Sequence, residues 1–161
     1  MGVLYVDTSA LARLYLQDEP DSDQLIELLL ASPESVVTSE LSRLELARAV
    51  KSAERAGRLP EADPVLERID AHLGTRIALI ELRAETILPG ARHLVLGHRL
   101  NTLDAIHLAV AIEESTALGE PIVFVTRDDE QAAAARELGL EVAYPPRCRD
   151  GAESGGRYFR A

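Results

Sequence analysis

The 161-residue chain contains a single cysteine, Cys148, and a single lysine, Lys51. One cysteine excludes an internal disulfide and any zinc site built from paired cysteines, as is typical of proteins kept in a reducing compartment. The N-terminus has no basic segment followed by an apolar run and a cleavage site, so we expect no secretion signal. These absences together predict a cytoplasmic protein.

Aromatic residues and long apolar runs are also scarce. Aromatic residues make up 4% of the chain although 47% of it is hydrophobic, so the core has to consist mainly of Leu, Val, Ile and Ala. No apolar run approaches the roughly 20 residues that a membrane-spanning helix requires, and we expect no membrane partner. The length fits one domain with a proper hydrophobic core.

Positive charge is in deficit, because 17 Lys and Arg stand against 27 Asp and Glu and leave a net charge of −10. This balance argues against broad electrostatic binding to nucleic acid, which usually shows as a basic domain. Three interpretations of the acidic charge remain. The charge favours solubility, or it suits a basic protein partner, or the protein is an enzyme that binds phosphates through divalent cations.

The sequence alternates between strand-like and helix-like segments. The expected strands cover residues 3–6, 36–38, 77–82, 122–126 and 140–143. The expected helices cover residues 10–16, 24–30, 40–56, 60–73, 84–96, 103–115 and 128–138, with Ser39 and Thr102 as caps and Pro60 as a helix start. Strands separated by helices imply an α/β domain with a parallel sheet covered on both faces. Residues 145–161 are rich in Pro, Gly and Arg without periodicity, and we expect a flexible tail there.

Two acids follow directly after expected strands. Asp7 ends the first apolar run, and Asp128 follows the clearest strand of the chain. The carboxyl edge of a parallel sheet is where ligands bind in open α/β folds. A carboxylate directly after a buried strand needs partners, so Asp7 is the more informative of the two.

Two further acids lie on helices with apolar faces. Asp104 falls in the first turn of the helix that carries the apolar run 105–112, and Glu45 lies next to the stripe formed by Leu41 and Leu44. Four acids gathered together would repel one another, and burial would raise their pKa values unless a cation balanced them. Oxygen ligands of this kind suit Mg²⁺ or Mn²⁺.

Each acid except Asp7 also has an ordinary explanation. Asp104 and Asp128 are favourable in the first turn of a helix, where a negative charge meets the positive end of the helix dipole. For Glu45 the alternative is a pairing with Arg43 or Arg48 on a solvated surface.

Four short sequence motifs resemble those of the PIN-domain ribonucleases, and most closely those of the VapC-type toxins of toxin–antitoxin pairs. The four motifs are, in chain order, Tyr5-Val6-Asp7-Thr8-Ser9-Ala10, Ser39-Glu40-Leu41-Ser42-Arg43-Leu44-Glu45, Leu103-Asp104-Ala105-Ile106-His107-Leu108-Ala109 and Val125-Thr126-Arg127-Asp128. The resemblance covers about residues 1–144. The region 57–100 carries no motif and is matched only by its helical character.

The resemblance implies a PIN-like nuclease domain over residues 1–144, folded as a three-layer sandwich. Its centre would be a five-stranded parallel sheet in the order 3-2-1-4-5, flanked by helices. The implied activity is metal-dependent hydrolysis of RNA phosphodiester bonds inside the strand, by the toxin of a type II toxin–antitoxin system. The implied partners are RNA, a cognate antitoxin whose segment fills the acidic cleft, and a second copy in a homodimer.

The resemblance also assigns the site residues. Asp7 and Asp104 would be the firmest ligands of Mg²⁺ or Mn²⁺, and Glu45 and Asp128 would complete the catalytic cluster of four acids. The residues implied as supporting hydrogen-bonders that orient carboxylates or metal-bound water are Ser9 and Thr126. The arginines near these positions in the sequence, which are candidates for a basic rim that attracts RNA, are Arg13, Arg43, Arg48, Arg99 and Arg127.

Two other functional hypotheses stay open at this point. One is a PIN-like scaffold that binds RNA or a partner without cutting, and the presence of all four acids argues against it. The other is a phosphoryl-transfer or receiver-type domain with Asp7 as acceptor, which fits poorly because Lys51 is the only lysine. The chain has no phosphate loop, dinucleotide fingerprint or nucleophile elbow. His107, three residues after Asp104, is expected to be a hydrogen-bonded core residue, and a supporting role beside the site is the alternative.

Overall fold

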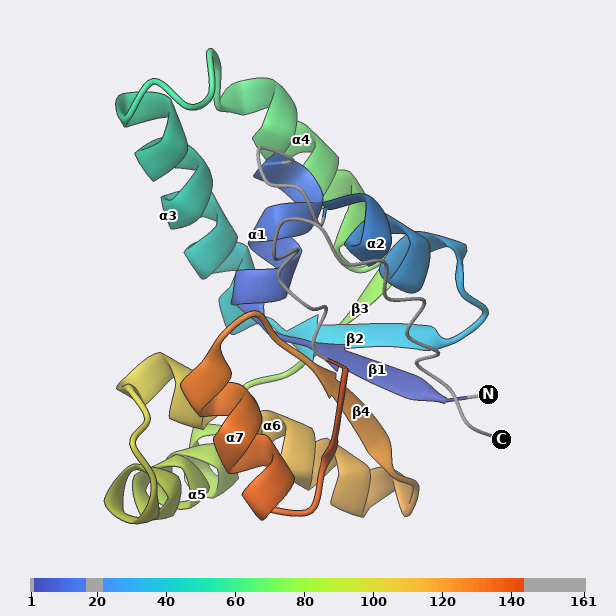
Figure 1. Cartoon of the computed structure of the whole chain (residues 1–161), viewed down its shortest axis with the longest axis vertical. Helices are drawn as coiled ribbons and strands as arrows, with labels where there is room; N and C mark the ends of the chain where they lie inside the picture. The colour runs from blue at the N-terminus through green and yellow to red at the C-terminus, as the bar shows by residue number, and fades with distance from the viewer. Residues whose placement is uncertain (1, 17–21, 144–161) are drawn as a thin grey trace, which may run out of the picture.

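The computed structural model describes residues 2–16 and 22–143, which form a parallel sheet with helices on both faces (Figure 1). The strands are β1 (Val3–Val6), β2 (Ser35–Ser39), β3 (Ile77–Ile80), β4 (Ile122–Val125) and β5 (Glu141–Ala143). Their order across the sheet is β3-β2-β1-β4-β5, so the predicted fold class and strand order are confirmed. The tail predicted over 145–161 lies outside the described residues.

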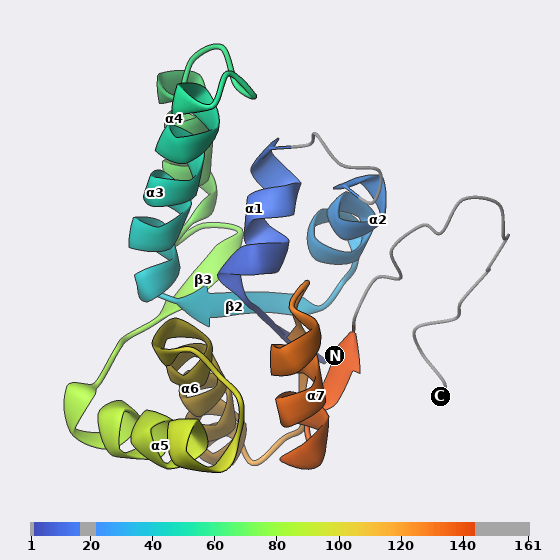
Figure 2. The same cartoon turned by 60° about the vertical axis from the view of Figure 1, so that its left-hand side comes forward.

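Seven α-helices and one π-helical turn connect the strands in the described part of the chain. They are α1 (Thr8–Leu16), α2 (Ser22–Ile26), η1 (Glu27–Ala31), α3 (Leu41–Arg55), α4 (Asp63–His72), α5 (Ala84–Gly97), α6 (Thr102–Leu118) and α7 (Asp129–Glu137). Helices α1 to α4 lie on one face of the sheet and α5 to α7 on the other. Figure 2 shows α3 and α4 side by side, extending away from the sheet.

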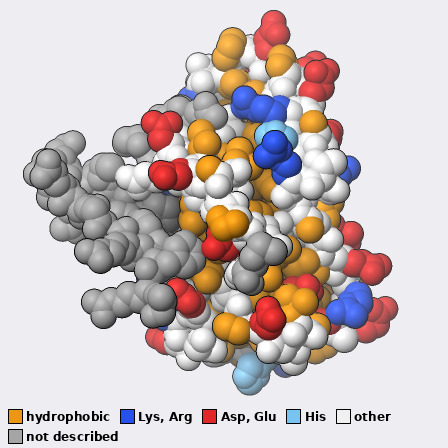
Figure 3. Space-filling model, turned by 90° about the vertical axis from the view of Figure 1, so that its right-hand side faces the viewer, with side chains coloured by type: hydrophobic (Ala, Val, Ile, Leu, Met, Phe, Trp, Pro, Cys, Tyr) orange, Lys and Arg blue, Asp and Glu red, His pale blue; other side chains and the backbone are white. Residues whose placement is uncertain are grey.

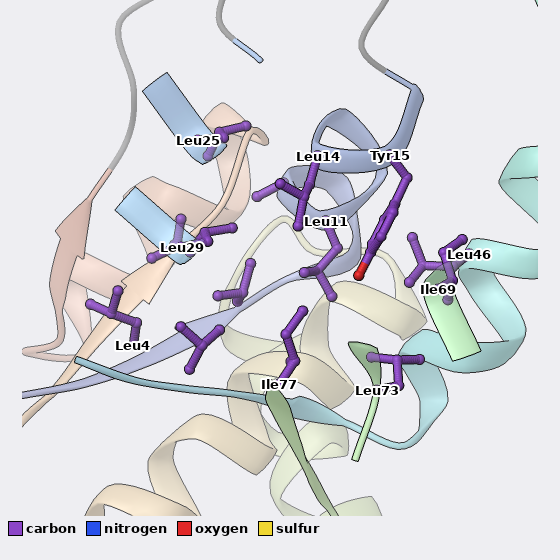
Figure 4. Packing of buried hydrophobic residues seen from close by; sticks show 14 of the residues in the cluster. Leu4, Leu11, Leu14, Tyr15, Leu25, Leu29, Leu46, Ile69, Leu73 and Ile77 are labelled. Atoms are coloured by element: carbon purple, nitrogen blue, oxygen red, sulfur yellow. The ribbon is translucent and has the colours of Figure 1, made fainter. Parts of the chain in front are cut away.

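The side chains of β1 alternate between two hydrophobic cores, as the geometry of a strand requires. Leu4 and Val6 belong to the core under α1, α2, α3 and α4, where leucines of α1 and α2 pack above the sheet (Figure 4). Tyr5 belongs to the core shared with α5, α6 and α7, and its ring stacks on Phe124 with the ring centroids 5.5 Å apart. Burial on both sides fixes β1 at the centre of the molecule.

The pairing register of the central strands sets the position of the candidate site. Val6 of β1 pairs with Val125 of β4, and the backbone N–H of Asp7 donates to the carbonyl of Val125 at 2.9 Å. The segments that follow β1 and β4 therefore leave the sheet side by side at its carboxyl edge. This register brings Asp7 next to residues 126–128.

Helix α6 is buried over residues 105–111, as its apolar sequence predicts. It ends at Gly119, whose φ of 68° lies in the left-handed region that glycine adopts without strain. Because α6 packs under the sheet, its first turn, which carries Asp104, is held at the edge where β1 and β4 end.

Several helix boundaries differ from the sequence prediction, and the differences at α4, α6 and α2 have identifiable local features. Helix α4 begins at Asp63 rather than Pro60, with another proline in its first turn. Asn101 rather than Thr102 caps α6, because the Asn101 side chain accepts a hydrogen bond from a backbone N–H of the first turn. The helix predicted over 24–30 divides into α2 and the π-helical η1.

No helix among the described residues is long and apolar enough to cross a membrane. On the face drawn in Figure 3, Asp and Glu side chains are distributed over much of the surface, whereas Lys and Arg gather in a few groups. This pattern agrees with the net charge of −10. A local cluster of arginines is therefore a departure from the general charge of the protein.

Candidate functional site

Asp7 lies at the junction of β1 and α1 and is almost fully buried, with 3% of its surface exposed. Its Oδ2 accepts a hydrogen bond from the backbone N–H of Ser9 at 2.9 Å, and its Oδ1 accepts one from the side-chain amide of Gln131 at 3.3 Å. The first turn of α1 also points its positive dipole end at this carboxylate. Asp7 is thus a buried acid with satisfied oxygens and a fixed orientation.

Asp128 follows β4 and caps α7, because its Oδ1 accepts the backbone N–H of Gln131 at 2.8 Å. The hydroxyl of the buried Thr126 accepts the Asp128 N–H at 3.1 Å and donates to Oε1 of Gln131 at 2.6 Å. The Ser9 hydroxyl lies 3.2 Å from that of Thr126 and accepts the backbone N–H of Arg127 at 2.9 Å. Ser9 and Thr126 therefore tie the ends of β1 and β4 together.

Asp104, in the first turn of α6, is partly buried and faces the other acids. Its pKa is raised from 3.8 to about 7, because burial disfavours the charged form and Asp7 and Asp128 repel it, while His107 opposes the shift. The side-chain amide of Gln131 also donates to the backbone carbonyl of Asp104 at 3.3 Å. Three acids from three separate elements therefore share one electrostatic environment.

Glu45 reaches the site from α3 and contacts two polar neighbours. Its Oε2 lies 2.6 Å from Nε2 of His107 and accepts the Thr8 hydroxyl at 2.7 Å. The same histidine nitrogen is 3.7 Å from Oδ1 of Asp7, and Nδ1 is 2.9 Å from the Tyr5 hydroxyl. Burial lowers the pKa of His107, but the hydrogen bond to Glu45 and the nearby carboxylates outweigh burial and raise it above 6.5. His107 therefore lies between Glu45 and Asp7.

The donor set can be compared with the requirements of a divalent cation. Within the described residues, no three His, Cys, Asp or Glu side chains stand close enough together to enclose a metal ion. The chemistry of the donors nevertheless fits a hard cation, because the four acids offer only carboxylate oxygens. Burial and, after it, repulsion by Asp7 and Asp128 raise the pKa of Asp104, and a bound cation would relieve the repulsion.

The basic rim expected from the sequence is only partly assembled. Three of its predicted members line one cavity together with Arg58, and these three are Arg13, Arg48 and Arg127. Arg43 is directed elsewhere, because its guanidinium lies 3.9 Å from Asp70 of α4. Arg99 is an exposed residue outside this cavity.

A family model described as the PIN domain matches residues 4–137, which is most of the chain. Ribonuclease VapC47 of Mycobacterium tuberculosis (strain CDC 1551 / Oshkosh) is 36% identical over 146 residues, covering 89% of this chain and 97% of the relative. The chain belongs to the VapC-type PIN-domain ribonucleases. Ribonuclease VapC46 of M. tuberculosis (strain ATCC 25618 / H37Rv) is likewise 36% identical over 149 residues, covering 90% of this PIN-domain chain and 99% of the relative.

Solved PIN-domain structures share the fold of this chain. M. tuberculosis VapC20, described as a sarcin-ricin loop cleaving toxin, superposes with a TM-score of 0.62 at 20% identity, over 88% of this chain and 99% of that one. VapBC2 from Rickettsia felis, bound to a DNA fragment from its promoter, gives a TM-score of 0.60 at 16% identity, over 88% and 98%. At sequence identities of 16–20%, these similarities show a shared fold and nothing more. The predicted resemblance to VapC-type PIN domains is confirmed by the family match and the curated relatives.

Two polar residues of this PIN domain were not singled out from the sequence. Gln131 is fully buried and contacts Asp7, Asp104 and Thr126, and Thr8 binds Glu45. The available signals were weak, since Gln131 only stands in the first turn of an expected helix and Thr8 only follows Asp7. His107 is buried and hydrogen-bonded as predicted, and its partners include the core residue Tyr5 and the site acid Glu45.

Proposed function

We propose that this PIN-domain protein is a metal-dependent endoribonuclease that acts as the toxin of a type II toxin–antitoxin system. One observation carries the proposal: Asp7, Asp104 and Asp128 arrive from three different elements at one sheet edge, where Asp104 titrates at about 7. Family membership supports the proposal, because the relatives VapC47 and VapC46 are named ribonucleases. The nuclease unit is proposed to comprise residues 1–144.

In the proposed site Asp7 and Asp104 are the firmest metal ligands, and Glu45 and Asp128 complete the catalytic cluster. The cation is Mg²⁺ or Mn²⁺, since both prefer oxygen ligands. A bound divalent ion supplies an activated water for attack on the phosphodiester and stabilises charge on the leaving oxygen.

The remaining polar residues of the site would hold the acids in place. The Ser9 backbone and the Gln131 amide orient Asp7, which leaves this buried carboxylate little freedom to rotate. His107 binds Glu45 and lies beside Asp7, and so would help to fix the position of Glu45. Thr126 supports the same edge through its hydrogen bonds to Gln131 and to the backbone of Asp128.

The proposed partners are RNA and an antitoxin. The structural neighbours include VapBC2 of R. felis and a toxin–antitoxin complex from Klebsiella pneumoniae, which support an antitoxin partner. The net charge of −10 favours a partner segment with basic residues that pair with the site acids. We extend the proposal to a homodimer and to a cytoplasmic location, where RNA and antitoxin would be present.

The proposed function is tested by brief expression of the chain in a bacterial host, followed by sequencing of cellular RNA ends. New RNA ends should appear with the parent chain and be absent with Asp7→Asn, and growth should stop only with the parent. Co-expression of a small protein from the neighbouring gene should restore growth. Harmless expression with no new RNA ends would contradict the proposal.

A further inference from the structure

A cavity of about 380 Å³ lies where α1, α3 and the segment after β4 meet. Four arginines line it, and these are Arg13, Arg48, Arg58 and Arg127. Among the described residues that line it, Asp128 is the only acid, in a protein with 17 basic and 27 acidic residues. The cavity is therefore a local concentration of positive charge in an acidic molecule, and its volume falls in the range typical of ligand-binding pockets.

The fold brings these arginines together from distant parts of the chain. Arg13 on α1 and Arg48 on α3 line the same cavity, because α1 and α3 pack against each other. Arg58 follows the turn at Gly57, which has a φ of 71°, and its backbone N–H donates to the carbonyl of Ala53 at 2.9 Å. Arg127 is buried, and its backbone N–H donates to Ser9. Two of the four arginines thus have backbones fixed by defined hydrogen bonds.

The cavity and the acidic cluster are adjacent parts of one surface. Ser9 and Asp128 line the cavity, and the same two residues belong to the hydrogen-bonded edge that carries Asp7. The cavity therefore begins at the edge of the proposed site.

We propose that the cavity binds a backbone phosphate of the RNA strand next to the phosphodiester that is cut. Guanidinium groups form paired hydrogen bonds with phosphate oxygens and keep their charge at any physiological pH. The apolar part of the lining, with Ala12 and Leu16, suits the carbon face of a ribose. This inference rests on the proposed ribonuclease function, and it explains how an acidic protein holds an anionic substrate.

A phosphate contact of this kind positions the substrate without reading its sequence. Binding energy from a neighbouring phosphate holds the reacting phosphodiester against the acids, which is the contribution of orientation to catalysis. Carboxylates of an acidic protein segment would meet the same arginines, but only a phosphate backbone also presents a phosphodiester at the acids of the site. We therefore assign the cavity to RNA.

The test compares the double variant Arg48→Gln/Arg58→Gln with Arg43→Gln, a control with the same type of charge loss. Arg43 lies on the same helix as Arg48, five residues away and so about 140° around the helix, and is near Asp70 instead. Binding of a short labelled single-stranded RNA is measured by fluorescence anisotropy in EDTA, at several salt concentrations and with several RNA sequences. Cleavage of the same RNA in Mg²⁺ is measured separately.

We expect RNA affinity to fall about tenfold for each pocket arginine removed, uniformly across RNA sequences. The slope of log K against log salt should decrease by about 0.7 for each arginine, and Arg43→Gln should leave both quantities unchanged. Arg48→Lys should keep the salt slope of the parent and recover only part of the affinity, because lysine keeps the charge without the planar fork. Thermal melting of each variant verifies that it is folded.

If the folded double variant binds RNA with the affinity and salt slope of the parent, and the parent cleaves RNA, the phosphate-binding role of the cavity is refuted and the proposed function stands. If the variants lose RNA affinity as expected but the parent chain does not cleave RNA, the phosphate-binding role of the cavity is supported and the nuclease proposal is contradicted. Arginine-dependent binding of an oligoglutamate peptide, with RNA binding unaffected, would assign the cavity to an acidic protein segment and overturn the inference.

Discussion

The Nε2 atom of His107 lies 2.6 Å from a carboxylate oxygen of Glu45, although the two residues are 62 positions apart in the chain. Glu45 belongs to α3 on one face of the sheet, and His107 belongs to α6 on the other. Their contact joins the two helical layers at the edge where Asp7 lies. The histidine therefore links the packing of the fold to the position of a site acid.

Replacing His107 by leucine tests this link. His107→Leu should lower cleavage by about 10- to 100-fold, because Glu45 loses the group that orients it. It should also destabilise the fold by about 1–3 kcal/mol, since buried polar groups lose their partner. Tyr5→Phe is the milder companion variant, because it removes one hydroxyl from the same histidine. Titration with Mn²⁺ measures metal binding, and cleavage assays measure the rate of RNA cleavage. Metal binding and cleavage equal to those of the parent in His107→Leu would refute the prediction.

The raised pKa of Asp104 predicts an effect on the stability of the metal-free protein. Its carboxyl titrates at about 7 in the folded chain, compared with about 3.9 in an unfolded one. The folded state thus binds more protons between these values, and the stability contributed by this group is lost as the pH rises from about 4 to 7. Asp104→Asn should therefore melt at a higher temperature than the parent at pH 8 in EDTA, with little gain near pH 4.

The matched control for this experiment is Glu67→Gln, an exposed acid on α4. It should change the melting temperature little at either pH. Asp104→Asn should also lose the stabilisation that Mn²⁺ gives the parent, because binding to the folded state alone raises the melting temperature. A lower melting temperature for metal-free Asp104→Asn at pH 8 would show that the carboxylate is not under repulsion.

Asp128 has a capping contact and a proposed site role, and two substitutions separate them. Asp128→Asn keeps a side-chain oxygen that caps α7 but removes the charge, whereas Asp128→Ala removes both. Only the alanine variant should lose stability, by about 1 kcal/mol. Cleavage should fall in both variants. Parental cleavage by a folded Asp128→Asn protein would limit Asp128 to its capping role.

Gln131 holds the ends of β1, β4 and α6 together without charge. Gln131→Ala should destabilise the chain by about 1–3 kcal/mol, because its removal takes one hydrogen bond each from the buried groups of Asp7 and Thr126. Gln24→Ala, on the exposed side of α2, should stay within about 0.5 kcal/mol of the parent. Urea titrations give both values, and equal values for the two variants would mean that Gln131 does not hold this edge.

Local patterns in the sequence were sufficient for the fold class, and they pointed to the four acids as candidates. Alternating apolar segments and caps identify the strands, and Asp7 and Asp128 stand out because acids rarely follow buried strands without a reason. The pairing of β1 with β4 came from the family resemblance, because parallel strands that meet in space are far apart in the chain.

Contacts between distant side chains set the limit of the sequence prediction. The link from His107 to Glu45 depends on how α3 and α6 meet, and no local pattern contains that information. Arg58 was missed for the same reason, since it lies beyond the end of α3 and reaches the cavity only because α3 packs on α1. The N-cap of α6 was wrongly predicted at Thr102, because the adjacent Asn101 is also a residue type that caps helices.

Cleavage of RNA by the purified full chain tests the central claim most directly. The parent protein should cut RNA with Mg²⁺ or Mn²⁺ and stop when EDTA is added. The variants Asp7→Asn and Asp104→Asn, folded as judged by thermal melting, should lose this activity. Equal cleavage by both variants, or cleavage that persists in EDTA, would contradict a metal site built on Asp7 and Asp104.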